Sequence, residues 1–204
     1  MSAWPQSTRG RYHAGAMHRD IKEVLFSAEA IHERVVDLGG RITRDLEGKD
    51  VVLLALLKGS VIFFADLMRS VSSAIRVDFA WVSSYGDRTQ SSGTVELKVF
   101  PDEDLRGKVV VVVDDILDTG RTMAAVVKKL KDDHGVDDVR TCVLLDKEAR
   151  RIVDLRADYA GFEVDDFFVV GYGLDYADRY RNLPYIGVLN ESCYQDEGET
   201  GDEA

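Results

Sequence analysis

The chain has 204 residues, of which 45% are apolar and 31% are charged. A chain of this length can bury about 70% of its unfolded surface, so it needs neither disulfides nor a structural metal to fold. Acidic residues outnumber basic ones by 37 to 26, giving a net charge of −11, which excludes a strongly basic nucleic-acid-binding protein. No apolar run approaches the roughly 18 residues that a transmembrane helix needs, so we expect no membrane partner.

Both ends of the chain differ from its body. Residues 1–19 are expected to be disordered or variable, and they lack the apolar stretch of a secretory signal. Residues 191–204 contain six acidic residues and no basic one, which predicts a disordered tail whose deletion leaves activity intact. The two cysteines, Cys142 and Cys193, make no disulfide framework, so we expect a reducing, cytoplasmic location.

The first half of the chain predicts two helices and three strands. Ser27 is expected to cap a helix with an apolar stripe at three-to-four spacing, formed by Ile31, Val35, Leu38, Ile42 and Leu46. The apolar run 51–56 predicts a buried strand, and a second helix begins at Val61. Apolar and polar residues alternate over 75–84 and again over 94–99, which predicts half-exposed strands. Between them, the polar segment 85–94 is typical of a mobile loop.

The second half of the chain predicts further buried strands. Five consecutive valines, 109–113, give the strongest indication, and a helix follows with Met123, Val126, Val127 and Leu130 on one face. The apolar runs 141–145, 167–170 and 186–189 predict three more strands. Strands that alternate with helices indicate an α/β fold, with a central parallel sheet flanked by helices. We expect a single domain over 20–190, in which 75–84 and 94–99 form a partly separate antiparallel flap.

The segment 111–123, VVVDDILDTGRTM, carries the most chemistry. Ligands of open α/β sheets bind at the carboxyl ends of strands, and a helix N-terminus there offers free N–H groups to a phosphate. Thr119 and Thr122 add hydroxyl donors, and Gly120 permits close approach of the backbone. Asp114 and Asp115 would repel a phosphate unless they bind sugar hydroxyls or a divalent cation. The segment has neither the spaced glycines of a dinucleotide site nor the Gly-Lys-Ser/Thr of a P-loop.

This segment resembles the 5-phosphoribosyl 1-pyrophosphate (PRPP) motif of type I phosphoribosyltransferases. Asp118 before Thr-Gly is similar to the 6-oxopurine branch, the hypoxanthine-guanine phosphoribosyltransferases. The resemblance implies that fold, with a small hood and a mobile loop. It also implies that Asp114 and Asp115 hold the ribose hydroxyls, directly or through a metal, and that Asp118 is the catalytic base for the purine N7 proton. Amides of the phosphate loop would hold the 5′-phosphate, through Asp118, Thr119, Gly120, Arg121 and Thr122.

Two further segments resemble loops of the same family. Lys58 and Gly59 follow a buried strand and are similar to the pyrophosphate loop, where a non-proline cis peptide bond before the lysine is typical. The sequence SSYG, with Ser84 and Tyr85 at its centre, resembles the mobile loop that closes over the reaction. Such closure would keep water from the reacting carbon.

A fourth segment resembles the family's purine site. Phe168 is similar to the ring that stacks on the base, and Val169 to the strand whose backbone binds its edge. The resemblance implies that Lys147 reaches the 6-oxo group, which would favour hypoxanthine over adenine. Asp175 resembles the carboxylate that holds Mg²⁺, and Arg181 the arginine that pairs with pyrophosphate.

The resemblance therefore implies an enzyme of purine salvage, with Mg²⁺ as cofactor, that acts as a homodimer or homotetramer. It would transfer the 5-phosphoribosyl group from PRPP to hypoxanthine, and to guanine as well. A preference for xanthine stays open, because backbone contacts that read the 2-substituent leave no mark in the sequence. The alternative of an RNA-binding regulator on the same fold would need a basic surface, whereas residues 1–190 hold 31 acidic against 26 basic residues. A ligand-sensing transcription regulator would need an added DNA-binding domain.

Overall fold

The computed structural model describes residues 17–84, 95–101 and 104–194. Its main sheet has six strands in the order β4-β3-β2-β5-β6-β7, and only β4, at one edge, is antiparallel to its neighbour. The strands are β2 (Val51–Leu57), β3 (Arg76–Ser84), β4 (Val95–Val99), β5 (Val109–Leu117), β6 (Asp138–Asp146) and β7 (Tyr159–Glu163). The helices are α1 (Ala28–Asp45), α2 (Val61–Ser70) and α3 (Arg121–Asp133), with short 3-10 turns η1 (Glu148–Arg150) and η2 (Glu191–Cys193).

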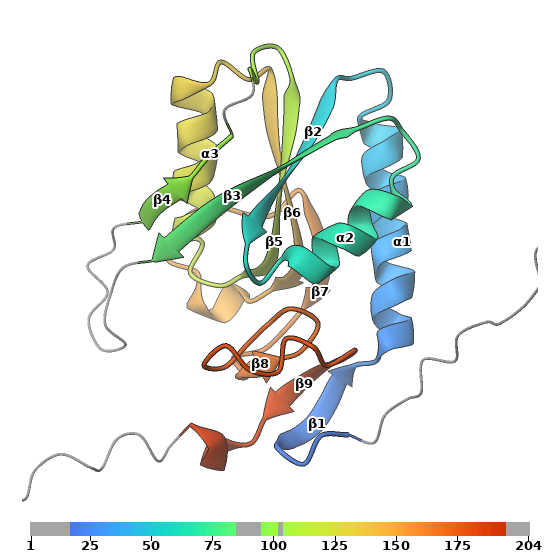
Figure 1. The fold of residues 1–204 in the computed structure, drawn as a ribbon, viewed down its shortest axis with the longest axis vertical. Coiled ribbons are helices and arrows are strands. Elements are labelled where there is room, and N and C mark those ends of the chain that lie inside the picture. The colour runs from blue at the N-terminus through green and yellow to red at the C-terminus, as the bar shows by residue number, and fades with distance from the viewer. Residues whose placement is uncertain (1–16, 85–94, 102–103, 195–204) are drawn as a thin grey trace, which may run out of the picture.

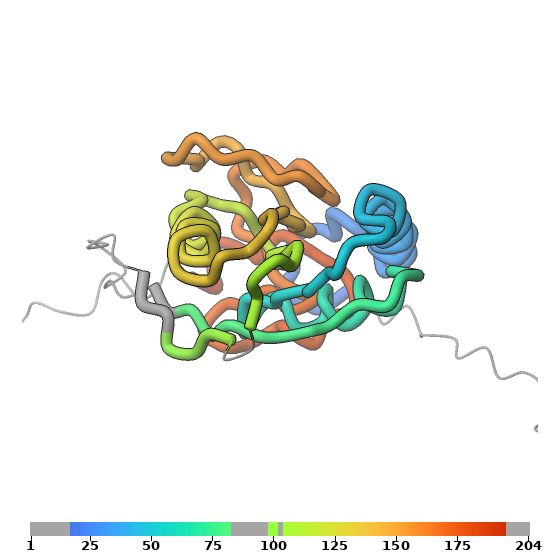
Figure 2. Tube along the Cα trace, turned by 90° about the horizontal axis from the view of Figure 1, so that it is seen from above, coloured from blue at the N-terminus to red at the C-terminus, as the bar shows by residue number. Residues whose placement is uncertain are grey.

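Helices cover both faces of the sheet, as Figures 1 and 2 show. Odd-numbered valines of β5, from Val109 to Val113, lie in one core with α1 and α2, whereas Val110 and Val112 lie in a second core with α3. Successive side chains of a strand point to opposite faces, so a strand buried on both faces is apolar throughout. None of the helices in the described ranges is long and apolar enough to cross a membrane.

Helix α1 forms as the sequence predicts. The Ser27 hydroxyl accepts a hydrogen bond from the amide of Ala30 at 3.3 Å and caps the helix. All five residues of the predicted stripe are buried. Gly39 sits where α1 crosses α2, and a Cβ there would lie 2.6 Å from the backbone of Ser70. A glycine inside this helix therefore allows the two helices to approach closely.

The expected separate flap is wrong. Strand β3 pairs in parallel with β2 over Val52–Leu57 and Arg76–Trp81, so it belongs to the main sheet, and β4 extends that sheet by one antiparallel strand. The half-exposed character of β3 is confirmed, but its larger apolar side chains lie on the more exposed face. Val77, Phe79 and Trp81 are 41–44% exposed, whereas Ala80 is fully buried.

The hood is instead a three-stranded antiparallel sheet, β1-β9-β8. It lies beyond the carboxyl ends of the main strands (Figure 1) and comprises β1 (Ile21–Phe26), β8 (Val169–Val170) and β9 (Ile186–Leu189). The expectation that 167–170 and 186–189 join the parallel sheet is therefore wrong. The first of these runs is also shorter than expected, because Phe167 and Phe168 precede β8 and are each 40% exposed. Strands β1 and β7 have no counterpart among the predicted elements.

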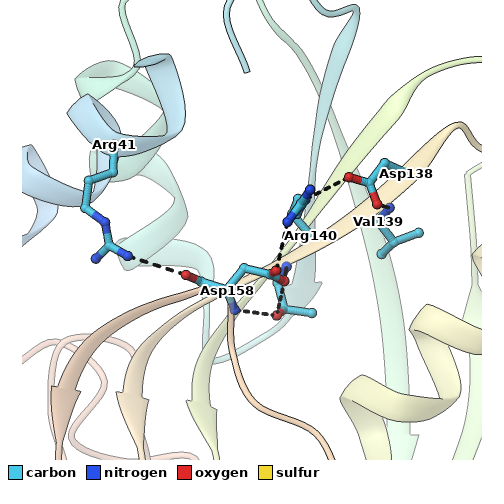
Figure 3. Close-up of polar contacts among 6 residues, drawn as sticks. Arg41, Asp138, Val139, Arg140 and Asp158 are labelled. Carbon is cyan, nitrogen blue, oxygen red and sulfur yellow. Dashed lines mark hydrogen bonds and ion pairs between the residues drawn. The ribbon is translucent and has the colours of Figure 1, made fainter. Parts of the chain in front are cut away.

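A polar network lies at the amino ends of β6 and β7 (Figure 3). Arg140 contacts Asp138 at 2.7 Å and Asp158 at 3.3 Å, and Arg41 of α1 donates to the Asp158 carbonyl at 3.4 Å. The Asp158 carboxylate accepts from both the amide and the hydroxyl of Thr141. These bonds link α1 to the start of β6 and β7.

Candidate functional site

The candidate site lies where two neighbouring strands send the chain in opposite directions. From β2 the chain passes through α2 to β3, and from β5 it passes through α3 to β6, on the other side of the sheet. Ligands of open α/β folds bind at such a switch point. The loops after β2 and β5 therefore open side by side, facing the hood (Figure 1).

Three segments meet at Gly59 without space for a methyl group. The peptide bond between Leu57 and Lys58 is cis, as the resemblance predicts. A Cβ on Gly59 would lie 1.8 Å from a carboxylate oxygen of Asp115, and a Cβ on Gly173, whose φ is +104°, would lie 2.1 Å from the Gly59 carbonyl oxygen. Glycine is therefore required at position 173, where φ is positive and the neighbour is backbone, while a side chain at position 59 would displace the Asp115 carboxylate.

Asp114 and Asp115 lie inside β5, not at its end, because the strand continues to Leu117. Both are half-buried, and their carboxylates accept hydrogen bonds from neighbouring amides at 3.0 and 2.8 Å. Burial, followed by the neighbouring charge of Asp115, raises the pKa of Asp114 well above its usual value. Burial also raises the pKa of Asp115, although hydrogen bonds with the Asp114 side chain and the Ile116 amide, and then the nearby Arg181, oppose this. Holding both carboxylates ionised therefore costs the folded protein stability unless a ligand contacts them.

We expect Asp114→Asn to raise the free energy of unfolding at pH 7 by about 0.5–2 kcal/mol, the scale of a typical stabilising substitution. A carboxyl group whose pKa is higher in the folded than in the unfolded protein lowers the free energy of unfolding as the pH rises. This loss begins near the unfolded pKa, about 3.9, and is complete above the folded pKa. The gain should therefore disappear near pH 3, where Asp114 is protonated in both states. Urea unfolding at the two pH values measures it, with the exposed Asp154→Asn as a control expected to change little.

The loop after β5 is held from one side by the segment after β6. Its carbonyls at residues 117–119 accept four hydrogen bonds from residues 147–152: Lys147 N and Arg151 Nη2 to Leu117, Arg151 Nε to Asp118 and Ile152 N to Thr119, at 2.8–3.2 Å. A trans peptide unit points its carbonyl and the following N–H in opposite directions. The N–H groups of residues 118–120 therefore face away from this support, as a phosphate cradle requires.

Helix α3 begins directly after this loop. Its N-cap is Gly120, with φ of +81° and no side chain that could cap the helix. A Cβ on Gly120 would lie 2.5 Å from the side chain of Val153, so both the conformation and the packing require glycine. The Thr119 hydroxyl accepts from the Arg121 amide at 3.5 Å, and the positive end of the helix dipole favours an anion at this position, next to Thr119 and Thr122.

The two carboxylate oxygens of Asp118 differ in their surroundings. Its Oδ2 contacts Arg150 at 3.3 Å, whereas its Oδ1 is buried and has no hydrogen-bond partner within the described part of the chain. Buried polar atoms almost always have partners, so this oxygen can accept a hydrogen bond from a bound ligand or from water. The position fits an acceptor for a proton of a bound base.

The two cations near Gly59, Arg181 and Lys58, are linked through a shared carboxylate. Arg181 contacts Asp175 at 2.7 Å and Asp178 at 3.1 Å, and it donates to the Gly173 carbonyl at 2.8 Å. Lys58 also contacts Asp178, at 3.4 Å. The neighbouring Arg181 and Lys58 lower the pKa of Asp178. Two of the predicted anion-binding cations therefore share one exposed carboxylate.

The predicted base-binding residues lie together at the edge of the hood. Lys147 is only 5% exposed, and its ammonium contacts the carboxylate of Asp166 at 2.7 Å and the carbonyl of Phe167 at 2.9 Å. Phe168 follows directly, 40% exposed, and Val169 pairs with Val188 in the hood sheet. The Lys147 ammonium therefore contacts the residues that directly precede Phe168.

The donor set can be tested for a divalent cation. Among the described residues, no three potential metal ligands gather into one group. Mg²⁺ does not need such a cage, because it commonly binds one or two carboxylates together with substrate phosphates and water. Asp175, with one oxygen on Arg181 and the other on the Asp178 amide, can contribute a further lone pair. Asp114 and Asp115 are neighbours on β5. Either Asp175 or this pair supplies the one or two carboxylates that such a site needs.

The structure thus brings most of the predicted site residues to one edge of the sheet. Ser84 ends β3, while Tyr85 and the rest of the expected mobile loop lie outside the described residues. Sequence reasoning missed Arg151 and Asp178, whose roles depend on partners 34 and 120 positions away along the chain. An arginine pair in a polar segment, or an aspartate in an Asp-rich loop, gives no pattern that marks it.

Comparisons with known proteins agree with this geometry. The sequence matches the family described as "Phosphoribosyl transferase domain" over residues 24–177. The hypoxanthine-guanine phosphoribosyltransferase of Streptococcus pneumoniae is 44% identical over 181 residues, which cover 87% of this chain and 98% of that protein. The bifunctional protein TilS/HprT of Listeria monocytogenes is 43% identical over 89% of this chain, which spans 28% of its length. A hypoxanthine phosphoribosyltransferase structure from Staphylococcus aureus aligns with a TM-score of 0.84 and 40% identity, covering 89% of this chain and 98% of that one. The chain therefore belongs to the phosphoribosyltransferase family, in the branch of the hypoxanthine-guanine enzymes.

Proposed function

We propose that this protein transfers the 5-phosphoribosyl group from PRPP to hypoxanthine, releasing pyrophosphate and forming IMP. The observation that carries the proposal is the phosphate cradle of residues 118–120, placed beside the paired Asp114 and Asp115 and the unpartnered oxygen of Asp118. A phosphate, a sugar and a base can then lie in sequence along one loop. The named activity of the relatives supports the same substrates.

Each part of the substrate has a fitting group. Amides at the start of α3 would hold the 5′-phosphate, far from the bond that breaks, so that its binding energy positions the sugar. Asp114 and Asp115 would accept hydrogen bonds from the ribose hydroxyls and favour positive charge on the ring as the bond to pyrophosphate breaks. Asp118 would accept the N7 proton of the purine as a general base.

The departing pyrophosphate would lie beside Lys58 and Arg181. For this, both cations would exchange their contacts with Asp178 for phosphate oxygens. Asp175, with Asp114 and Asp115, would hold Mg²⁺, which supplies positive charge that stabilises the leaving pyrophosphate.

The base would be selected at Lys147. Its ammonium donates hydrogen bonds and accepts none, so a keto oxygen at position 6 fits it and an exocyclic amine does not. Phe168 offers a flat apolar face to the ring, and the Val169 backbone can bind its edge. We propose hypoxanthine and guanine as the bases, with xanthine as the second candidate, since all three carry the 6-oxo group.

The test is an assay of purified protein with PRPP and each of hypoxanthine, guanine, xanthine and adenine, with Mg²⁺ and with excess chelator. We expect IMP from hypoxanthine in Mg²⁺, little turnover in chelator, and a kcat/KM for adenine lower by about 10²-fold or more. Equal turnover of adenine, or no nucleotide from any base, would contradict the proposal.

We also propose that the protein is cytoplasmic. A separate proposal is that it self-associates through the exposed face of β3. Val77, Phe79 and Trp81 form an apolar strip there, and Val99 of β4, 54% exposed, pairs with Trp81. Contiguous exposed apolar side chains commonly mark an interface. Sedimentation velocity should show a dimer or tetramer, and Trp81→Glu should shift it to monomer. A wild-type protein that sediments as a monomer would contradict self-association.

A further inference from the structure

Three aromatic rings pack together at the edge of the hood. The ring of Tyr194 stacks on that of Phe168, with centroids 5.2 Å apart and planes inclined by 24°. Tyr176 lies edge-on to Phe168, at 5.5 Å and 85°, and contacts Tyr194 at 6.3 Å and 62°. These geometries lie within the range in which aromatic pairs attract one another.

Tyr194 is held in place by the fold. It follows η2, where its amide donates to Glu191 O at 3.1 Å and the Cys193 amide donates to Asn190 O at 2.9 Å. The Asn190 amide in turn donates to Asp20 O at 2.8 Å. The ring itself is partly buried against a small apolar core formed by Ile21, Val170, Tyr185 and Leu189. Residues 191–194, which their composition assigns to the acidic tail, thus contact the hood.

Phe168 needs such a support. It is 40% exposed and precedes β8, and its carbonyl accepts a hydrogen bond from Leu189 N at 2.9 Å, which holds the backbone but not the ring. An exposed phenylalanine ring exchanges rotamers on the picosecond-to-nanosecond timescale unless neighbours restrict it. With Tyr194 stacked on it and Tyr176 in a T-shaped contact, the ring is restricted in orientation while 40% of it stays exposed.

We propose that Tyr194 is a positioning residue for the purine base: it stacks on Phe168 and holds that ring ready to receive the base on its opposite face. The proposal rests on the proposed function, in which Phe168 is the wall of the base site. The proposal also changes the outcome expected for deletion of residues 191–204, because this deletion would remove Tyr194 and with it the support of the Phe168 ring.

The test compares steady-state kinetics of full-length variants with hypoxanthine and PRPP. We expect Tyr194→Ala to raise the KM for hypoxanthine about 3- to 10-fold, the scale of one aromatic pair, and to change the KM for PRPP and kcat less than twofold. Tyr194→Phe keeps the ring and should restore the wild-type value. Cys193→Ala, which shortens the neighbouring side chain of the same turn, is the matched control and should leave all three constants unchanged. If Tyr194→Ala does not fold, Tyr194→Leu, which is apolar but not flat, should show the same KM increase.

A Phe168→Ala variant separates this proposal from the function on which it rests. We expect it to raise the KM for hypoxanthine, and Tyr194→Ala to add nothing in its background, because the ring that Tyr194 supports is gone. An unchanged KM in Phe168→Ala would overturn the base site itself. A raised KM in Phe168→Ala but not in Tyr194→Ala would overturn the role of Tyr194 alone. Two further results for Tyr194→Ala would also overturn it: a lower KM for hypoxanthine, which would mean that Tyr194 covers the face the base needs, or equal losses for both substrates.

Discussion

Replacing Asp118 with asparagine should lower kcat for hypoxanthine by about 10²–10⁴-fold, the usual contribution of a general base. Asparagine keeps the size of the side chain but cannot take up a proton at its amide oxygen. The backbone carbonyl of Asp118, which accepts from Arg151 at 2.9 Å, is untouched, so the phosphate loop should keep its shape. The KM for PRPP should therefore change little.

Steady-state kinetics with both substrates varied measure this result, and Arg150→Met is the control. That variant removes the cation 3.3 Å from Asp118 but leaves the carboxylate. Because Arg150 is 52% exposed, the ion pair is weak, and we expect its loss to change kcat little. Wild-type kcat in Asp118→Asn would restrict Asp118 to shaping the turn. A loss of PRPP binding without a loss of kcat would make its role structural.

Arg151→Met should reduce the free energy of unfolding by about 3 kcal/mol and raise the KM for PRPP. The guanidinium is only 10% exposed, and it donates to the carbonyls of Leu117, Asp118 and Leu155 and to the carboxylate of Asp146. Methionine can fill the space but leaves these acceptors unpaired. The phosphate loop would then lose the bonds that turn its N–H groups toward the ligand.

Urea unfolding and PRPP kinetics measure the two effects. Arg156→Met is the control, because that arginine is 89% exposed and only 3.9 Å from Glu148, and it should change stability by less than about 0.5 kcal/mol. Equal stabilities of the two variants would show that Arg151 does not support the loop. A destabilised Arg151→Met with an unchanged KM for PRPP would separate the loop's stability from phosphate binding.

The central fold could be predicted because its pattern is local. The valines of β5 and the apolar stripe of α1 predict burial from residues that lie close together in the sequence. The burial of both sets is confirmed. Strand β1 was missed because Lys22 and Glu23 interrupt its apolar pattern, and only pairing with β9, far along the chain, makes it a strand. The alternation over 75–84 predicts a separate flap, whereas β3 belongs to the main sheet and has one exposed face.

The residues proposed to bind phosphate and sugar could be named from the sequence because one motif places them in order along β5 and the start of α3. The supports of these groups could not. Arg151 acts on carbonyls about 34 positions earlier, and Tyr194 acts on a ring 26 positions earlier, so nothing in their neighbouring residues marks them. Contacts that depend on tertiary packing leave no periodicity to read.

The contact of Asp115 with Gly59, and of Gly59 with Gly173, has a consequence for how this protein can be varied. These are two separate contacts: a methyl group added at position 59 would overlap the Asp115 carboxylate at 1.8 Å, and one added at position 173 would overlap the Gly59 carbonyl oxygen at 2.1 Å. Residues in such contact have non-additive mutational effects. A side chain at position 59 would displace the carboxylate that the proposed ribose site needs, whereas one at position 173 would have to move backbone. Variation of the pyrophosphate loop is therefore coupled to the placement of Asp115.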